Sequence, residues 1–488
     1  MTDWLRTALE HLQQTGGEAV LDSRLVRPGD VFVALPGAAV DGRDFIQQVL
    51  GQPRVLVIAE QADAQHASQA QLPVTPDSGN ERVLWVTDLR QRLGQLAEAL
   101  YAVNERALSL VGVTGTNGKT SISHYVAQAL STKGRCGLIG TLGVGLWPDL
   151  EGGLNTTPDV LTNHRLLADW SDQQADWAVM EVSSHALDQG RVDGLRFRVA
   201  LFTHLSRDHL DYHGDMEQYF AAKQKLFDPA RSQRAVICTD DRWGLRLAQG
   251  RKDSLRVSGR IGGTASVVPN HIRRRPEGLL VHWVTPWGPL QTDTRLIGDF
   301  NVANLAVTIG ALGMLGLTGK MIQAALADVQ PVSGRMQPVP LPNGAVVIID
   351  YAHTPDALEK ALRASRHHTE GELHCVFGCG GDRDRGKRPQ MAAAAAAEAD
   401  RLWLTSDNNR SESFASIVGD MRPGLTTDVP FEVIADRTAA IHAAIAATKA
   451  GDVIVVAGKG HENYQEDQGV RRPYSDFGAV QQAMGGVA

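Results

Sequence analysis

VGVTGTNGKTS, residues 111–121, joins an apolar run to a helical pattern through a glycine-rich turn. Glycine lets the backbone approach an anion closely, and the first N–H groups of the following helix point at the same place. Lys119 is predicted to reach the outer phosphates of a nucleotide, and the Thr120 hydroxyl to bind Mg²⁺. The first glycine of the common phosphate-loop motif would stand at 113, where this chain has Val, so the loop is a variant. A plain glycine turn beside a surface lysine is the alternative interpretation.

Apolar runs and helical stretches alternate on both sides of this loop, which is typical of an α/β protein. The pattern begins again near residue 107 and near residue 335, so we expect three domains in series, at 1–105, 106–334 and 335–488. The central domain is predicted to be a phosphate-loop sheet of mostly parallel strands with crossover helices. The last is predicted to be a Rossmann-like sheet, with strands near 346–350, 373–378, 401–405, 431–435 and 452–458.

The composition is that of an ordinary globular chain. Its 488 residues carry 48 Lys and Arg against 55 Asp and Glu, a net charge of −7. Such a chain is not expected to coat nucleic acid, which requires clustered basic side chains. Asp3 and Glu10 interrupt the N-terminal segment, and no run of about 18 apolar residues follows, so we expect no signal peptide or membrane span. These features predict a cytoplasmic protein.

Cys136, Cys238, Cys375 and Cys379 are too few and too dispersed for a disulfide framework. We expect buried, reduced thiols that pack as small apolar side chains. The alternative is that Cys375 and Cys379 bind a metal, although no second cysteine pair or nearby histidine pair accompanies them.

Carboxylates and histidines follow two predicted strands of the central domain. Glu181 ends an apolar run at the carboxyl side, where open α/β sheets place their ligands, and is a candidate Mg²⁺ ligand. THLSRDHLDYHG, residues 203–214, contains three histidines whose spacing does not suit a tetrahedral zinc site. His209 is an unusual but acceptable partner for Glu181 at a magnesium ion. A polar loop histidine without a ligand is the alternative.

Nine short motifs occur along the chain: GTNGKT (115–120), NTTP (155–158), EVSSHAL (181–187), SRDHLDYHG (206–214), GDFNVANL (298–305), DYAHTPDAL (350–358), FGCGGDRDRGKRP (377–389), DNNR (407–410) and GKGHE (458–462). In this order they closely resemble the motifs of the ATP-dependent Mur ligases. The match covers nearly the whole chain, starting with DSRLVRPGDVFVALPG (22–37).

The resemblance implies a UDP-substrate-binding N-terminal domain, a central ATPase domain and a C-terminal domain that brings an amino acid. It implies that meso-diaminopimelate is joined to the D-glutamyl carboxylate of UDP-N-acetylmuramoyl-L-alanyl-D-glutamate, in peptidoglycan precursor synthesis. ATP would first convert the carboxylate into an acyl phosphate, with Mg²⁺ as cofactor. We expect a monomer that binds these three small molecules. The alternatives are the same reaction with L-lysine, or a non-catalytic, nucleotide-dependent switch.

Residue roles follow from the same motifs. The resemblance assigns ATP to Gly115, Thr116, Asn117, Gly118, Lys119, Thr120, Ser121, Asn301, Arg335 and Asp350. It assigns the UDP substrate to Ser23, Asn155, Thr156, Thr157, Ser183, Gln189 and Arg191. It assigns diaminopimelate to Arg383, Asp407, Asn408, Asn409, Arg410, Gly458 and Glu462. Taken one by one, hydroxyls and amides in turns are usually local caps, and Asp350 alone would be interpreted as a cap at a strand end.

Lys223, in QYFAAKQKLF (218–227), would be interpreted from sequence as a surface lysine on an amphipathic helix. The resemblance implies instead that CO₂ carbamylates it, which gives an anion able to bind Mg²⁺. The implied metal ligands are then Thr120, Glu181, His209 and Lys223, and the implied catalytic residues are Lys119, Lys223, His209 and Glu181. Carbamylation requires a neutral amine, so burial or neighbouring cations must lower the pKa of the lysine.

Asn409 departs from the pattern, because the diaminopimelate-adding members of the family usually carry Asp-Asn-Pro-Arg where this chain has Asp407-Asn408-Asn409-Arg410. Asparagine also favours turns, so we expect the loop to keep its course. Arg410 remains, and a guanidinium binds a carboxylate through two hydrogen bonds. The motif therefore favours an amino acid with a second carboxylate over L-lysine.

Overall fold

The computed structural model describes residues 2–37, 40–61, 82–152, 155–275, 278–425 and 428–485. The chain forms two compact units, residues 1–116, 133–201 and 206–235 in the first, and 117–132, 202–205 and 236–488 in the second. Each unit is described by itself below. The described residues include no helix long and apolar enough to cross a membrane.

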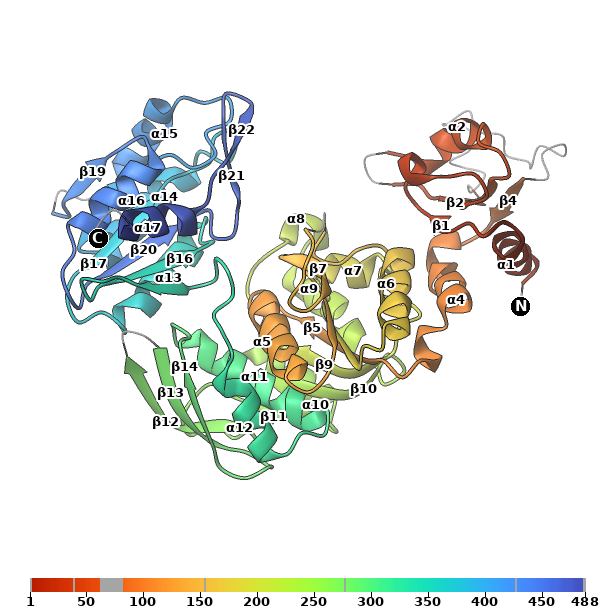
Figure 1. The fold of residues 1–488 in the computed structure, drawn as a ribbon, viewed down its shortest axis with the longest axis horizontal. Coiled ribbons are helices and arrows are strands. Elements are labelled where there is room, and N and C mark those ends of the chain that lie inside the picture. Colours follow the sequence, from red (N-terminus) through yellow and green to blue (C-terminus); the bar gives the residue numbers. More distant parts are fainter. Residues whose placement is uncertain are drawn as a thin grey trace. The chain divides into compact units, whose positions relative to one another are not determined.

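The N-terminal part of the first unit, red in Figure 1, contains a four-stranded parallel sheet. Its strand order is β1-β2-β3-β4. Its strands are β1 (Ala19–Val20), β2 (Val31–Ala34), β3 (Leu56–Glu60) and β4 (Val83–Val86). Side chains of β2 and β3 alternate between two cores, as successive residues of a strand must. One core packs against α1 (Asp3–Thr15) and α4 (Leu89–Tyr101), and the other against α2 (Ile46–Leu50).

A seven-stranded sheet follows, in the order β11-β10-β9-β5-β8-β6-β7. Its strands are β5 (Ser109–Thr114), β6 (Cys136–Gly140), β7 (Gly143–Leu146), β8 (Trp177–Glu181), β9 (Phe197–Phe202), β10 (Ser232–Cys238) and β11 (Leu255–Val257). Strands β5, β6 and β8 pair in parallel, and only the edge strand β7 is antiparallel to its neighbour among the pairs described. The predicted mostly parallel sheet is therefore confirmed, and its continuous apolar runs fit strands buried on both faces.

The helices of this region connect these strands. They are α5 (Lys119–Ser131), α6 (Val160–Asp172), α7 (Ser184–Asp188), α8 (Leu210–His213), α9 (Met216–Gln224) and α10 (Arg242–Gly250). Helix α5 begins at Lys119, directly after Gly118 of the glycine-rich turn.

A small antiparallel sheet, β12-β13-β14, comes next in the second unit and has no counterpart in the sequence-based expectation. Its strands are β12 (Val268–Arg275), β13 (Gly278–Val284) and β14 (Leu290–Thr294), visible as three green arrows in Figure 1. The buried positions of β14 alternate with exposed ones, as in a sheet with one solvated face. Two helices follow, α11 (Phe300–Met314) and α12 (Gly319–Ala327).

The C-terminal sheet has six strands in the order β15-β16-β20-β17-β18-β19. They are β15 (Gln337–Pro340), β16 (Val346–Asp350), β17 (Leu373–Phe377), β18 (Arg401–Leu404), β19 (Phe431–Val433) and β20 (Val453–Ala457). All pair in parallel except β15. The five strands predicted here are all present, so the Rossmann-like pattern is confirmed.

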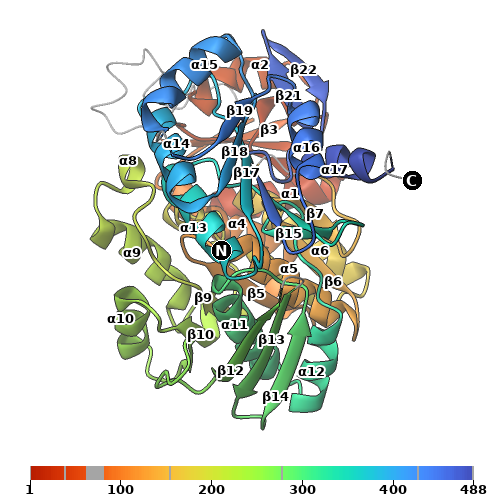
Figure 2. The same cartoon turned by 90° about the vertical axis from the view of Figure 1, so that its left-hand side faces the viewer.

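Helices cover both faces of this sheet. One core contains α13 (Pro355–Arg366), α14 (Lys387–Glu398) and α15 (Phe414–Met421), and the other contains α16 (Arg437–Ala446) and α17 (Asp476–Gly485). In Figure 2, α14 and α16 lie on opposite sides of β17 and β18. A hairpin, β21 (Tyr464–Asp467) and β22 (Val470–Pro473), follows β20. The carboxyl ends of β16, β17, β18 and β20 meet at one edge, where a ligand site is expected.

All four cysteines are buried and unbonded, as predicted. Burial raises the pKa of each thiol well above its ordinary value. Cys375 and Cys379 pack in the core of the C-terminal sheet rather than at a metal site. Among the described residues, no group of three or more His, Cys, Asp or Glu is placed to hold a metal ion.

Candidate active site

Lys223 is buried in the first unit, with only 1% of its surface exposed. Its ammonium donates to the Gly115 carbonyl at 2.9 Å and lies 4.7 Å from the centre of the Tyr219 ring. The Tyr219 hydroxyl is in turn 3.2 Å from the Thr116 hydroxyl. The interpretation of Lys223 as a surface lysine is therefore wrong, because α9 turns this side chain against the glycine-rich turn.

The rest of the glycine-rich turn lies in the second unit. Gly118 precedes α5 with a φ of +83°, and a Cβ there would come within 2.8 Å of Asn304 Oδ1. Only glycine fits both constraints. Asn117 is exposed and its carbonyl accepts from the Thr203 hydroxyl at 2.7 Å. Thr120 and Ser121 are buried in the first turn of the helix, beside the partly exposed Lys119.

Asn301 is held inside the second unit by its own neighbours. Its Oδ1 accepts from the Tyr125 hydroxyl at 3.1 Å and from Asn304 Nδ2 at 2.9 Å. Its Nδ2 donates to the Ile297 carbonyl at 2.8 Å. The geometry thus gives Asn301 a role in fixing the start of α11, while its predicted contact with ATP stays a prediction.

Glu181 is fully buried at the carboxyl end of β8. Its carboxylate accepts from the Thr141 backbone N–H at 2.8 Å and from the Thr141 hydroxyl at 3.2 Å. A Cβ at Gly140 would come within 2.4 Å of the same carboxylate, so glycine is required beside it. The side chain is fixed in one orientation at the strand end where sequence placed it.

The residues predicted to hold the UDP substrate form a connected network around Thr157. Its hydroxyl donates to the Glu181 carbonyl at 2.7 Å, and its carbonyl accepts from Arg191 Nη1 at 2.9 Å. Arg191 also donates to Gln189 Oε1 at 2.7 and 3.1 Å. Ser183 donates its N–H to the Thr157 hydroxyl at 3.2 Å and caps α7.

The three other predicted UDP-substrate residues lie apart from this bonded set or at its margin. Thr156 is 3.1 Å from the Thr141 hydroxyl. Asn155 is exposed, and Ser23 begins a short 3₁₀ turn, Ser23–Leu25, in the N-terminal part.

His209 belongs to an aromatic cluster in the first unit. The ring centres of His185 and His209 are 4.9 Å apart, and those of His185 and His213 are 5.4 Å apart. His213 Nε2 lies 2.9 Å from the Ser184 hydroxyl. Burial lowers the pKa of His185 and of His213, which favours neutral imidazoles at pH 7. His209 itself is exposed, with a left-handed φ of +53° at the position just before α8.

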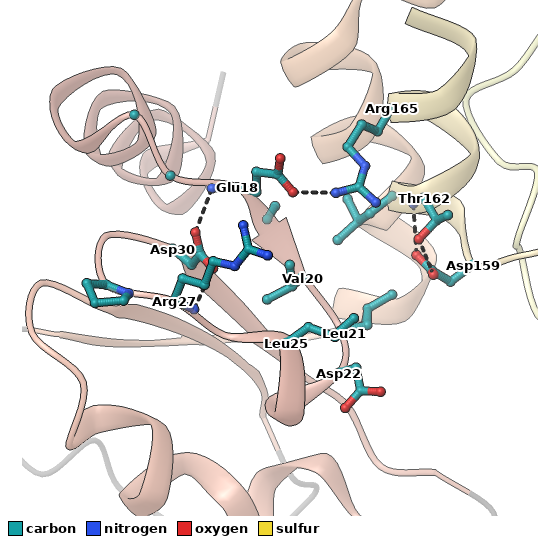
Figure 3. Close-up of a pocket in the computed structure, with 15 residues that line it drawn as sticks. Glu18, Val20, Leu21, Asp22, Leu25, Arg27, Asp30, Asp159, Thr162 and Arg165 are labelled. Carbon is teal, nitrogen blue, oxygen red and sulfur yellow. Dashed lines mark hydrogen bonds and ion pairs between the residues drawn. The ribbon is translucent and has the colours of Figure 1, made fainter. Parts of the chain in front are cut away.

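A cavity of about 460 Å³ opens in the first unit beside β1 and the start of α6 (Figure 3). The Glu18 carboxylate pairs with the Arg165 guanidinium across it. Asp30 accepts from the backbone N–H groups of Glu18 and Arg27 at 2.8 and 2.7 Å. Part of the lining, from Asp22 to Asp30, lies inside the quoted stretch 22–37 and next to Ser23, but none of the lining residues was assigned a role from the sequence.

The DNNR loop follows β18 at the carboxyl edge of the last sheet. Asp407, Asn408 and Asn409 are buried, and Arg410 has a left-handed φ of +52°. Asn408 Nδ2 donates to Glu462 Oε2 at 3.0 Å, so the loops after β18 and β20 are bonded together as their assignment to one ligand requires. Arg410 Nη1 donates to the Gly381 carbonyl at 2.7 Å. This bond connects the DNNR loop to the loop after β17, which carries the exposed Arg383.

Three buried cations beneath these loops were missed by sequence reasoning. Arg388 pairs with Glu412 at 2.7 Å and Asp420 at 2.8 Å, Arg437 pairs with Asp476 at 2.7 Å, and Lys459 pairs with Glu462 at 3.1 Å. Arg388 and Lys459 stood inside quoted motifs, FGCGGDRDRGKRP and GKGHE. Only the fold shows that they point inward, because most of their partners are distant in sequence.

Arg335 and Asp350 lie where the chain enters the C-terminal sheet. Asp350 accepts from the N–H groups of Met336 at 2.8 Å and Ala352 at 2.9 Å, so it does cap its own strand end. Burial raises the pKa of its carboxyl group. The Arg335 guanidinium lies 5.0 Å from the Tyr351 ring centre, and its buried Nε has no hydrogen-bond partner in the protein. An anion or polar ligand there would satisfy that donor.

Comparison with known proteins shows the family to which the chain belongs. The Mur ligase middle domain matches residues 113–312, the glutamate ligase domain of Mur ligases matches 334–460, and the catalytic domain of the Mur ligase family matches 20–101. The chain belongs to the Mur ligase family and is a ligase, with three α/β domains in series. The exact bounds at 105/106 and 334/335 stay a prediction.

Within the family, its curated relatives carry one name. A Chromobacterium violaceum protein named UDP-N-acetylmuramoyl-L-alanyl-D-glutamate–2,6-diaminopimelate ligase is 45% identical, over 99% of this chain and 97% of the relative. A Pseudomonas aeruginosa protein of the same name is 44% identical, over 96% and 94%. A solved structure with that name is 34% identical, with a TM-score of 0.73 over 96% of this chain and 95% of that one.

A more distant solved structure shares the fold alone. MurF ligase from Thermotoga maritima, in complex with ADP, is 19% identical, with a TM-score of 0.62 over 94% of this chain and 95% of that one.

Proposed function

We propose that this chain joins meso-diaminopimelate to the D-glutamyl carboxylate of UDP-N-acetylmuramoyl-L-alanyl-D-glutamate, with ATP converted to ADP and phosphate. The observation that carries this proposal is near full-length identity of 44–46% to relatives named for that reaction. The bonded loops after β18 and β20, which hold the predicted amino-acid residues together, support the same assignment.

Activation of the carboxylate is assigned to the phosphate loop. The N–H groups at the start of α5 and the Lys119 ammonium would stabilise the charge of the γ-phosphoryl group as it moves to a carboxylate oxygen and ADP leaves. The remaining predicted ATP residues, Asn301, Arg335 and Asp350, would bind the rest of the nucleotide. The unpartnered Arg335 Nε supports a polar ligand at that point.

Magnesium fits the donors available, which are mostly oxygens: the Thr120 hydroxyl, the Glu181 carboxylate and a carbamate on Lys223, with one imidazole from His209. The bound cation would neutralise phosphate charge. The buried amine of Lys223 supports carbamylation, because burial disfavours the ammonium form that CO₂ does not attack. Glu181 is already fixed by Thr141, which orients its carboxylate.

Ligation would follow at the C-terminal domain. The amino group of diaminopimelate attacks the acyl carbon, loses a proton, and inorganic phosphate leaves with the electrons of the broken C–O bond. Arg383 and Arg410 would bind carboxylates of the amino acid, and Glu462 would accept from its distal ammonium. The UDP substrate would be held by the Thr157 network and by Ser23, Asn155 and Thr156. We assign the activity to a cytoplasmic monomer.

Phosphate release by the purified protein tests this function. We expect ATP hydrolysis to require both the nucleotide-dipeptide and meso-diaminopimelate, and to be lost in Lys119→Ala while Lys133→Ala, an exposed lysine after the same helix, stays active. A nucleotide-dependent switch would hydrolyse ATP at a rate that ignores both substrates. L-Lysine used as well as meso-diaminopimelate would select the other ligase assignment.

A further inference from the structure

Lys459 is a fully buried cation of the amino-acid-binding region, with 0% of its surface exposed. Its ammonium donates to Asn408 Oδ1 at 2.9 Å, to Glu462 Oε2 at 3.1 Å and to the Tyr464 carbonyl at 2.8 Å. A lysine ammonium has three N–H donors, so these three bonds use all of them. Lys459 is therefore bonded entirely within the protein and presents no donor to a substrate.

Its three acceptors come from two segments that are distant in sequence. Asn408 lies in the loop after β18, Glu462 in the loop after β20, and Tyr464 begins the β21 hairpin strand. Asn408 Oδ1 also accepts from the Glu466 N–H at 2.9 Å. One ammonium thus fixes the orientation of an asparagine and a glutamate that the proposed function places around the amino acid.

The charges around Lys459 also support a role in positioning its neighbours. The Asp407 carboxylate lies 3.9 Å from the Lys459 ammonium. The buried ammonium therefore interacts with two carboxylates of the region, Asp407 and Glu462. Without the cation, the repulsion between the carboxylates would not be offset, and Asn408 Oδ1 would lose one of its two donors.

Glycines on both sides of Lys459 make this burial possible. Gly458 has a φ of +117°, and a Cβ there would lie 2.6 Å from Asp407 Oδ2. Gly460 has a φ of +53°, and its Cβ would lie 2.8 Å from the Gly334 carbonyl. The chain turns sharply at both positions, and the side chain between them is directed beneath the DNNR loop.

We propose that Lys459 is a positioning residue for amino-acid selection, which holds Asn408 and Glu462 in the geometry that recognises the distal end of meso-diaminopimelate. This inference rests on the proposed function. According to this inference, Lys459 affects amino-acid binding through Asn408 and Glu462. It has no effect on the binding of ATP or of the UDP substrate.

The test measures KM and kcat for all three substrates in the full-length wild type, Lys459→Met and Lys459→Gln. Lys449→Met is the matched control, because Lys449 is exposed in the same domain. We expect KM for meso-diaminopimelate to rise about 10- to 100-fold in Lys459→Met, with KM for ATP and for the UDP substrate changed by less than about twofold. The preference for meso-diaminopimelate over L-lysine should fall with it.

Lys459→Gln keeps two N–H donors without the charge and should give a smaller rise in the same direction, which keeps the test decisive if the methionine variant does not fold. Unchanged KM for meso-diaminopimelate in a folded variant, or equal losses for all three substrates, would overturn the proposal. Wild-type turnover that does not depend on meso-diaminopimelate would instead refute the proposed function, and the inference with it.

Discussion

Lys223 donates to the Gly115 carbonyl from a buried position, which is a costly place for an ammonium group. A carbamate at the same nitrogen would replace that cation with oxygens suited to Mg²⁺. We predict that Lys223→Ala loses ligation, that added bicarbonate does not restore it, and that a short carboxylic acid partly does. Steady-state phosphate release measures all three.

Lys225→Ala is the matched control for this prediction. Lys225 lies two residues further along, and its partly exposed ammonium bonds Asp188 at 3.0 Å. We expect this variant to keep its activity. Full activity of Lys223→Ala would show that the carbamate assignment is wrong.

Arg410 combines a left-handed backbone with a guanidinium anchored at the Gly381 carbonyl. That bond uses one of the five N–H donors of the guanidinium, so the remaining donors can still bind a carboxylate. We predict that Arg410→Ala reduces the preference for meso-diaminopimelate over L-lysine by about 2 to 5 kcal/mol. The ratio of kcat/KM for the two amino acids measures it. Equal use of both by the unaltered protein would contradict the assignment.

At the scale of elements, Arg437 connects the carboxyl end of β20 to the start of α17. Its Nη2 donates to the Ala457 carbonyl at 2.9 Å, and its guanidinium pairs with Asp476, at the start of α17, at 2.7 Å. Both side chains are 0% exposed. We predict that Arg437→Met lowers the free energy of unfolding by about 3 to 5 kcal/mol, because Asp476 would be left as an unpaired buried charge.

Chemical denaturation checks this against Arg363→Met. Arg363 forms ion pairs with Glu359 and Glu398, but its side chain is 62% exposed, so its loss should cost about 0 to 1 kcal/mol. Similar losses from both variants would mean that the buried pair has no special role in holding the sheet.

The sequence predicts a helix or strand well only where the element has a clear local pattern of apolar residues. Strands β16, β17, β18 and β20 are continuous apolar runs, and a parallel sheet buried on both faces requires such runs. The β12–β14 sheet was missed because its first strand ends in HIRRR, whose polar side chains face solvent. The motifs located the candidate site through family resemblance. The burial of Arg388, Arg437 and Lys459 had no local signal, since it depends on loops that meet only in the fold.

At the scale of the whole molecule, three imidazoles among the described residues resist protonation most strongly. They belong to His124 in α5, His164 in α6 and His461 after β20. Burial lowers the pKa of each to about 4, from an ordinary value of 6.5. In the unfolded chain the same groups accept protons once the pH falls below about 6.5.

The unfolding free energy should therefore decrease as the pH falls from about 6.5 to about 4, because in this range the unfolded state binds more protons than the folded state. A fully buried imidazole lowers the unfolding free energy by about 3 kcal/mol at the lower end of this pH range.

His164 is the histidine to substitute: its Nε2 lies 2.9 Å from the Asp193 carbonyl, a contact that the amide of His164→Gln can keep without titrating. We predict that urea denaturation of His164→Gln at pH 7, 6, 5 and 4 shows a shallower loss of stability than the wild type. His271→Gln, at an exposed position of β12, should follow the wild type. A His164→Gln slope equal to that of the wild type would mean that the folded protein accommodates the charged ring, for example through the Glu98 carboxylate 3.7 Å from His164 Nδ1.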